Sequence, residues 1–168
     1  MAGVLAIKVR KLIIIHLNCW LRCHRALPLV SILKHHFMKF MIQAGGILGA
    51  LAVALGAFGA HALKGMLEAS GRMETFETAV KYQFYHALAM VLVGILMQRA
   101  GSPAAGTDAV RLLGWSGNAF AIGVIIFSGS LYAICFTGIT KFGATAPIGG
   151  LALIAGWVLL VIAAGKLV

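Results

Sequence analysis

The side chains with the clearest chemical potential are two histidines and a glutamine that interrupt long apolar runs. His61 lies three residues before Lys64, whereas His86 lies five residues after Lys81 and three residues after Gln83. Because these two lysines bound the same connecting segment, both imidazoles are predicted at a similar depth on neighbouring helices. Polar and ionisable groups that sit at membrane depth are costly and usually face the interior of a bundle.

Two interpretations of this region remain open. In the first, His61, Gln83 and His86 form a polar intramembrane site between the first two helices. In the second, each imidazole bonds a backbone carbonyl or a lipid headgroup and only fixes the helical hairpin. The first predicts a function for the residues, and the second predicts a structural role.

The sequence contains no residue pattern that indicates catalysis or metal binding. Catalysis usually needs paired carboxylates, a nucleophile beside a base, or a set of metal ligands. Cys135 has no neighbouring base in sequence, and Ser128-Gly129-Ser130 is not a nucleophile elbow. The acids all lie in two connecting segments: Glu68, Glu74, Glu77 and Asp108. One further cluster fits no familiar zinc spacing: His16, Cys19, Cys23 and His24. We therefore expect no enzymatic activity, no metal site and no cofactor.

The composition predicts a membrane protein. Of the 168 residues, 61% are hydrophobic and 11% are charged, whereas soluble domains have roughly 45–50% and 25%. The net charge is +10, but half of the basic residues precede Phe40 and the others lie at the ends of apolar runs. Such placement is typical of membrane boundaries. The lipid bilayer is therefore the predicted partner, and nucleic acid is not.

Four apolar runs are long enough to cross a hydrocarbon core of roughly 30 Å, which takes about 20 helical residues. Because their connections are short, we predict an all-α, antiparallel four-helix transmembrane bundle. Residues 1–37 form a basic N-terminal extension, either an interfacial arm or an over-extended translation start, and the membrane domain is 38–168. The predicted spans are about 41–63, 78–98, 112–137 and 144–165.

Small residues recur at helical spacing in the first and fourth runs. In membranes such stripes allow two backbones to approach closely, and van der Waals packing then holds the helices together. The first stripe comprises Gly45, Gly49, Ala52, Gly56 and Ala60, and the second comprises Gly149, Gly156 and Ala163. We predict helix-packing roles for the glycines among them.

Four motifs in this order resemble the DUF423 family of small integral membrane proteins, over roughly residues 41–166. They are GALAVALGAFGAHALK at 49–64, ETAVKYQFYHALA at 77–89, FSGSLYAICFTG at 127–138 and APIGGLALIAGW at 146–157. The resemblance implies a four-helix, multi-pass protein of the bacterial inner membrane with no assigned biochemical activity. It implies no catalytic residue, and residues 1–37 lie outside it.

The sequence therefore favours a structural or interaction role in the membrane, with a homo-oligomer or a membrane-protein partner. The alternative is a small transporter or channel-like protein that uses the polar site between the first two helices. A transporter predicts a water-accessible cavity at mid-membrane, around Asn118 and the Ser128–Ser130 turn. A packing protein predicts a dry bundle.

Overall fold

The computed structural model describes residue 32, residues 34–100 and residues 107–167. The chain divides into two compact units, Met1–His36 and Phe37–Val168. Most of the predicted N-terminal extension, including the cluster of His16, Cys19, Cys23 and His24, lies outside the described residues. The fold below is that of the second unit, whose first helix begins three residues earlier, at Lys34.

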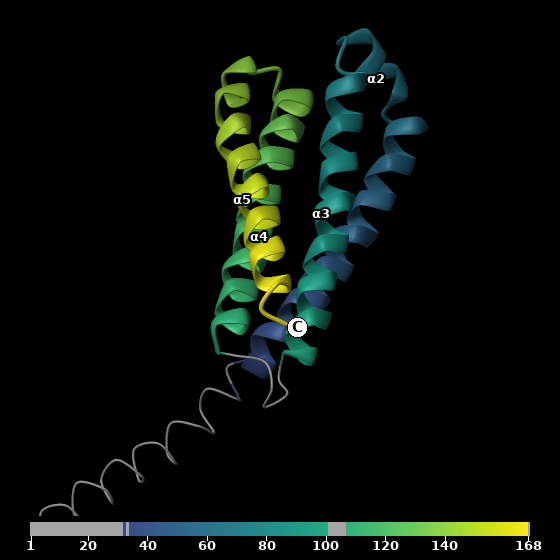
Figure 1. Cartoon of the computed structure of the whole chain (residues 1–168). Helices are drawn as coiled ribbons and strands as arrows, with labels where there is room; N and C mark the ends of the chain where they lie inside the picture. The colour runs from purple at the N-terminus through teal and green to yellow at the C-terminus, as the bar shows by residue number, and fades with distance from the viewer. Residues whose placement is uncertain (1–31, 33, 101–106, 168) are drawn as a thin grey trace, which may run out of the picture. The chain divides into compact units, whose positions relative to one another are not determined.

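Four long helices run alternately up and down (Figure 1). They are a first helix at Lys34–Ala60, α3 at Met73–Arg99, α4 at Thr107–Thr137 and α5 at Ala146–Ala164. All four are long and apolar enough to cross a membrane. No strand occurs among the described residues. These observations confirm the predicted all-α, four-helix transmembrane bundle.

Two connections at the same end of the bundle contain short helices that the sequence did not predict. The first is α2 at Lys64–Ala69, and the second is the 3-10 helix η1 at Thr140–Thr145. Gly71 and Gly138 take positive φ angles of 65° and 79° beside these helices, a conformation that glycine adopts without a Cβ penalty. The Arg72 guanidinium donates to the Gly138 carbonyl at 3.3 Å, so the two connections are joined.

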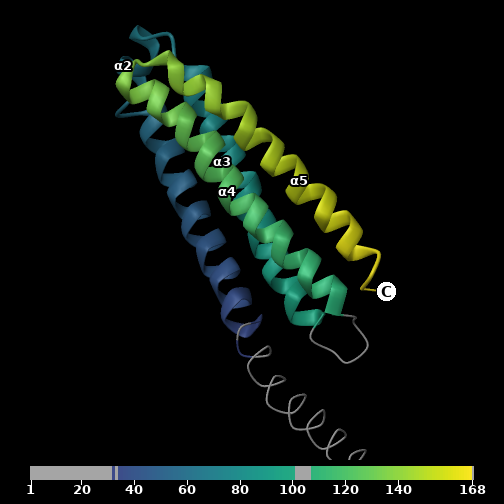
Figure 2. The ribbon, with the colours of Figure 1, turned by 90° about the vertical axis from the view of Figure 1, so that its left-hand side faces the viewer.

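Helix α3 lies between the first helix and α4, and α5 packs along α4 (Figures 1 and 2). The first helix also reaches α4, because Met41 on the first helix lies against Gly117. Toward α2 the first helix diverges from α3 (Figure 1). The described helices therefore form a bundle that is packed more closely at the end opposite α2.

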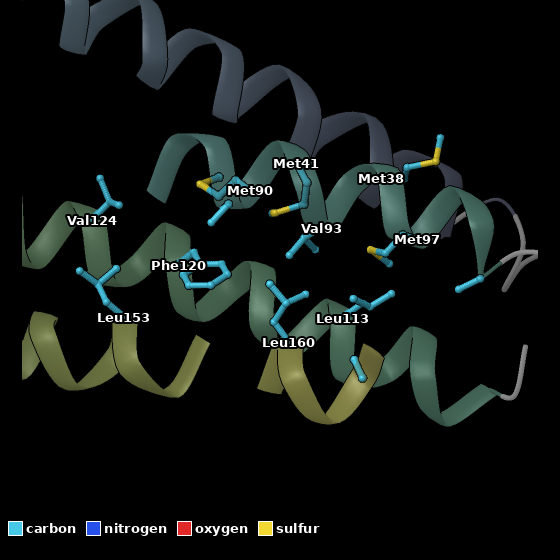
Figure 3. Packing of buried hydrophobic residues seen from close by; sticks show 13 residues of the cluster. Met38, Met41, Met90, Val93, Met97, Leu113, Phe120, Val124, Leu153 and Leu160 are labelled. Carbon is cyan, nitrogen blue, oxygen red and sulfur yellow. The ribbon is translucent and has the colours of Figure 1, made fainter. Parts of the chain in front are cut away.

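Apolar side chains from all four helices fill the interior toward that end (Figure 3). Met41, Leu113 and Phe120 are among the completely buried members of this cluster. A smaller cluster of Leu67, Phe76 and Cys135 lies toward α2. Four methionines in the larger cluster (Met38, Met41, Met90 and Met97) suit an interior between helices, because unbranched thioether side chains fill irregular gaps.

Three of the five predicted packing glycines lie against a neighbouring helix so closely that a Cβ atom would clash. A Cβ on Gly45 would lie 2.7 Å from the Ala87 carbonyl oxygen, and one on Gly149 would lie 2.5 Å from the Phe127 nitrogen. A Cβ on Gly156 would lie 2.6 Å from the Phe120 ring. These glycines allow close approach of the first helix to α3 and of α5 to α4.

Gly49 and Gly56 have more room. A Cβ on Gly49 would lie 3.9 Å from the nearest atom of Ala87, and one on Gly56 would lie 3.5 Å from Val80, both ordinary van der Waals distances. The last residue of the predicted stripe does not face the bundle, because Ala60 is exposed whereas Gly59 is buried. A Cβ on Gly59 would meet the Phe76 ring at 2.6 Å, so Gly59 rather than Ala60 continues the contact surface.

Candidate functional site

A layer of polar side chains crosses the bundle at the middle of α3. Gln83 and His86 lie one helical turn apart on the inner face of this helix, and each is only 5% exposed. This placement follows from the apolar pattern of α3, in which Ala79, Ala87 and Met90 line the same buried face. Two polar side chains from one helix therefore enter an otherwise apolar interior, where they need hydrogen-bond partners.

Gln83 hydrogen-bonds to two other helices. Its Nε2 donates to the backbone carbonyl of Leu48 on the first helix at 2.8 Å. Its Oε1 accepts a hydrogen bond from the Tyr132 hydroxyl on α4 at 3.0 Å. One side chain thus links the first helix, α3 and α4, and both ends of its amide have a partner.

His86 extends the layer to α5. Its Nδ1 lies 2.7 Å from the Tyr82 carbonyl oxygen, which can only accept, so Nδ1 carries a proton. Its Nε2 lies 3.2 Å from the Trp157 indole nitrogen, which can only donate, so Nε2 accepts. The imidazole is therefore held in one neutral tautomer with both nitrogens bonded.

Aromatic rings surround this imidazole. The His86 ring centroid lies 5.9 Å from that of Tyr82, 5.7 Å from that of Phe120 and 6.2 Å from that of Trp157. Phe120 and Trp157 also meet edge to face, with centroids 5.2 Å apart. Aromatic pairs with this geometry add to the stabilisation that comes from burial alone. The surroundings favour a rigid, apolar packing of the neutral ring.

Three serines of α4 are buried in the interior. The Ser116 hydroxyl donates to the Gly156 carbonyl on α5 at 2.8 Å, close to the Phe120 contact of the same glycine. The Ser130 hydroxyl donates to the Phe127 carbonyl of its own helix at 2.8 Å. The Ser128 hydroxyl is buried and has no hydrogen-bond partner within the described part of the chain.

His61 does not belong to this layer. It is exposed and lies in the turn that follows the first helix. It shares a helical face with Ala50, Ala54 and Ala57, and all three are also exposed, so this face points away from the bundle. The structure therefore brings Gln83 and His86 together and leaves His61 apart.

The layer also involves more of the bundle than the sequence indicated. The prediction placed the polar site between the first two helices, whereas the hydrogen bonds of Gln83 and His86 reach all four long helices. The sequence analysis missed Tyr132 and Trp157. Both carry a polar atom within an apolar run, which was the available signal. Within the described ranges, no three His, Cys, Asp or Glu side chains come together to hold a metal ion.

Comparison with known proteins identifies the family. The sequence profile of "Protein of unknown function (DUF423)" matches residues 55–150. The chain belongs to the DUF423 family. The matched region contains the polar residues of α3 and α4 described above, Gln83, His86 and Tyr132. The resemblance inferred from the four sequence motifs is thereby confirmed.

Curated relatives of this DUF423 protein share most of its length. It is 40% identical to a UPF0382 membrane protein of Staphylococcus haemolyticus over 78% of this chain and 99% of the relative. It is 41% identical to the UPF0382 membrane protein YwdK of Bacillus subtilis over 77% of this chain and 98% of the relative. The UPF0382 inner membrane protein YgdD of Escherichia coli is 35% identical over 77% of this chain and 92% of the relative. No solved structure matches the chain.

These names, together with four helices long enough to span, confirm a multi-pass membrane protein with no assigned activity. The predicted membrane localisation is confirmed as well, and the Escherichia coli relative is named an inner membrane protein.

Proposed function

We propose that this protein has a structural, non-catalytic role in the membrane and associates with a second copy of itself through α4. The observation that carries the proposal is the position of Asn118. This residue is a polar amide exposed on the outer face of α4. It lies seven residues beyond Arg111, which corresponds to about 10 Å along the helix. An amide at that depth faces hydrocarbon unless a partner covers it.

The residues around Asn118 form a continuous outer face. Trp115, Ile122 and Ile125 are 62%, 54% and 68% exposed, and Gly129 is exposed as well. Together with Asn118 they are spaced by three and four residues, as in the contact seam of a coiled coil. We call these five residues the Asn118 face. Its small Gly129 permits close approach of a second helix, and its isoleucines supply contact area.

A second copy is the partner that fits this face best. A carboxamide carries both donors and an acceptor, so two Asn118 side chains related by a two-fold axis can bond each other. Two-fold contacts between identical patches are the commonest form of oligomer. Interhelical hydrogen bonds of this kind contribute about 1–2 kcal/mol in model peptides within membranes.

The buried layer supports a structural role over the transporter alternative. The hydrogen bonds of Gln83, His86 and Ser116 tie neighbouring helices together, which favours a rigid bundle over one that opens for a substrate. Asn118 was expected to line a transporter's cavity, but it faces outward instead. Because the outer face of a rigid bundle is already ordered, little conformational entropy is lost when two copies associate.

The test is the oligomeric state of Asn118→Val compared with the wild type. We expect the wild-type protein to dimerise in lipid bilayers, and the substitution to raise the dissociation constant about tenfold. The measurement is fluorescence energy transfer between labelled copies in vesicles as the lipid-to-protein ratio is increased.

Gln43→Leu is the matched control, because it removes an exposed amide from the first helix, outside the Asn118 face. We expect this variant to dimerise as the wild type does. A wild-type protein that stays monomeric at high density, or an Asn118→Val variant with unchanged energy transfer, would refute the proposal.

A further inference from the structure

The first helix and α3 diverge toward α2 (Figure 1). Side chains and backbone of α2 and of these two helices line a groove there. Its upper part has a volume of about 510 Å³, and a second part of about 270 Å³ continues along the same two helices. Gly56, Val80 and Lys81 line both parts, so they form one continuous groove. Gly56 leaves room for the groove, because a Cβ there would meet only Val80, at 3.5 Å, whereas the Phe76 ring already packs against Gly59.

The two ends of the groove differ in chemistry. The lower part is lined by Ala52, Val53, Phe84 and Tyr85, and is almost entirely apolar. The upper part carries two lysines and two glutamates over an apolar floor of Phe76 and Val80. The polar end adjoins the α2 connection, where the chain leaves the apolar span, and the apolar end lies deeper along the helices. The groove is therefore polar near α2 and apolar deeper along the helices, the same order as the headgroup and acyl chains of a membrane lipid.

The four charges at the upper end form two ion pairs. Lys64 on α2 lies 3.8 Å from Glu68, and Lys81 on α3 lies 2.9 Å from Glu77. All four side chains are more than half exposed, so they can exchange these partners for charges on a ligand. The two positive and two negative charges cancel, so this end of the groove carries charges of both signs and is not basic overall.

We propose that this groove binds a zwitterionic aminophospholipid, one of whose acyl chains occupies the part between the first helix and α3. The headgroup phosphate contacts Lys64 and Lys81, and the headgroup ammonium contacts Glu68 and Glu77. An anionic lipid supplies the phosphate but no cation for the two glutamates. The balanced charges therefore select a zwitterionic lipid over an anionic one.

The test uses the full chain in mild detergent, with native mass spectrometry to count bound lipids. Phosphatidylethanolamine and phosphatidylglycerol of the same chain length are titrated separately. We expect one phosphatidylethanolamine to be retained in preference to phosphatidylglycerol. Lys64→Gln and Lys81→Gln should each weaken its retention about fivefold, the size expected for one lysine at a membrane surface. Lys141→Gln is the matched control, because Lys141 is exposed at the same end of the bundle but lies outside the groove.

A second variant tests the acyl-chain part independently of charge. Gly56→Leu places a branched side chain in the groove, and we expect it to abolish retention while the protein stays folded, because a Cβ at Gly56 would meet only Val80, at an ordinary van der Waals distance of 3.5 Å. Ala54→Leu is its control on an exposed position of the same helix. If both lipids are retained equally and the lysine variants have no effect, the groove contacts lipid without selecting a headgroup, and the proposal is overturned. Retention of the lipid by the Gly56→Leu variant would also overturn the proposal. Ala57 lines the apolar part of the groove, so a disulfide cross-link between Ala57→Cys residues of two copies would show that a second protein covers the groove in place of a lipid, and would overturn it as well.

Discussion

Replacing Gly149 by alanine is expected to lower the free energy of unfolding by about 1–3 kcal/mol, the cost of overpacking a tight contact. The added Cβ would lie 2.5 Å from the nitrogen and 2.8 Å from the Cα of Phe127. These are backbone atoms within a helix, so they cannot rotate aside as the end of a side chain can. Helices α4 and α5 must therefore separate, and the packing along their whole contact weakens.

Thermal unfolding in detergent measures this effect, and Gly150→Ala is the matched control. Gly150 is the next residue in the same helix, but a Cβ there would lie 3.9 Å from the nearest atom of the Phe127 ring. Both substitutions raise helix propensity equally, so this contribution cancels in the comparison. A Gly149→Ala protein as stable as Gly150→Ala would show that α4 and α5 do not meet at this position.

The same comparison is available on the first helix. A Cβ on Gly45 would clash with the Ala87 carbonyl and with Val91, whereas a Cβ on Gly46 would meet nothing within 4 Å. Spacing alone placed Gly45, Gly49 and Gly56 in one stripe, but it could not rank them. The rank depends on the bulk of the residue that lies opposite, and that residue belongs to another helix. Sequence therefore indicated which face of the first helix packs, and not which glycine matters most.

The number of long helices and their alternating direction could be predicted, because they depend on properties of each segment alone. An apolar run of sufficient length must be helical in a membrane, and short connections make neighbours antiparallel. The helix bounds differ by several residues from the predicted spans. Met73–Arg99, for example, begins before the predicted 78, because Glu74 and Glu77 continue the helix beyond the apolar run.

The polar layer could be predicted only in part. Gln83 and His86 stood out because they interrupt an apolar run, and the structure places both in the interior. Their partners Tyr132 and Trp157 did not stand out. Helix α5 is apolar on every side, and the polar residues of α4 lie both on its buried face (Ser116, Ser128) and on its outer face (Asn118), so neither helix shows which face meets α3. His61 has a depth along its helix that resembles a site residue, but depth does not tell which face of a helix points inward.

Replacing Gln83 by leucine is expected to lower the stability of the bundle clearly. This substitution keeps most of the side-chain volume but removes the hydrogen bonds to Leu48 and Tyr132. The Tyr132 hydroxyl, in a half-buried residue, then loses its acceptor. Leaving a buried polar group unbonded costs about 1–3 kcal/mol, so we expect a clear loss of thermal stability in detergent. Gln98→Leu, at an exposed position near the end of α3, is the control and should change little.

A double-mutant cycle with Tyr132→Phe separates the hydrogen bonds from packing. Tyr132→Phe removes only one hydroxyl. Within a folded membrane protein, double-mutant cycles give interhelical hydrogen bonds about 0.6 kcal/mol on average, less than the range found in model peptides, so the effect of Tyr132→Phe should be smaller than that of Gln83→Leu. In the Gln83→Leu background the Tyr132 hydroxyl has lost its acceptor, and its removal should cost nothing or restore stability. Strictly additive losses would show that Gln83 and Tyr132 act independently. The link between α3 and α4 would then depend on apolar contacts such as Phe76 with Tyr132, whose ring centroids are 5.4 Å apart, rather than on the polar layer.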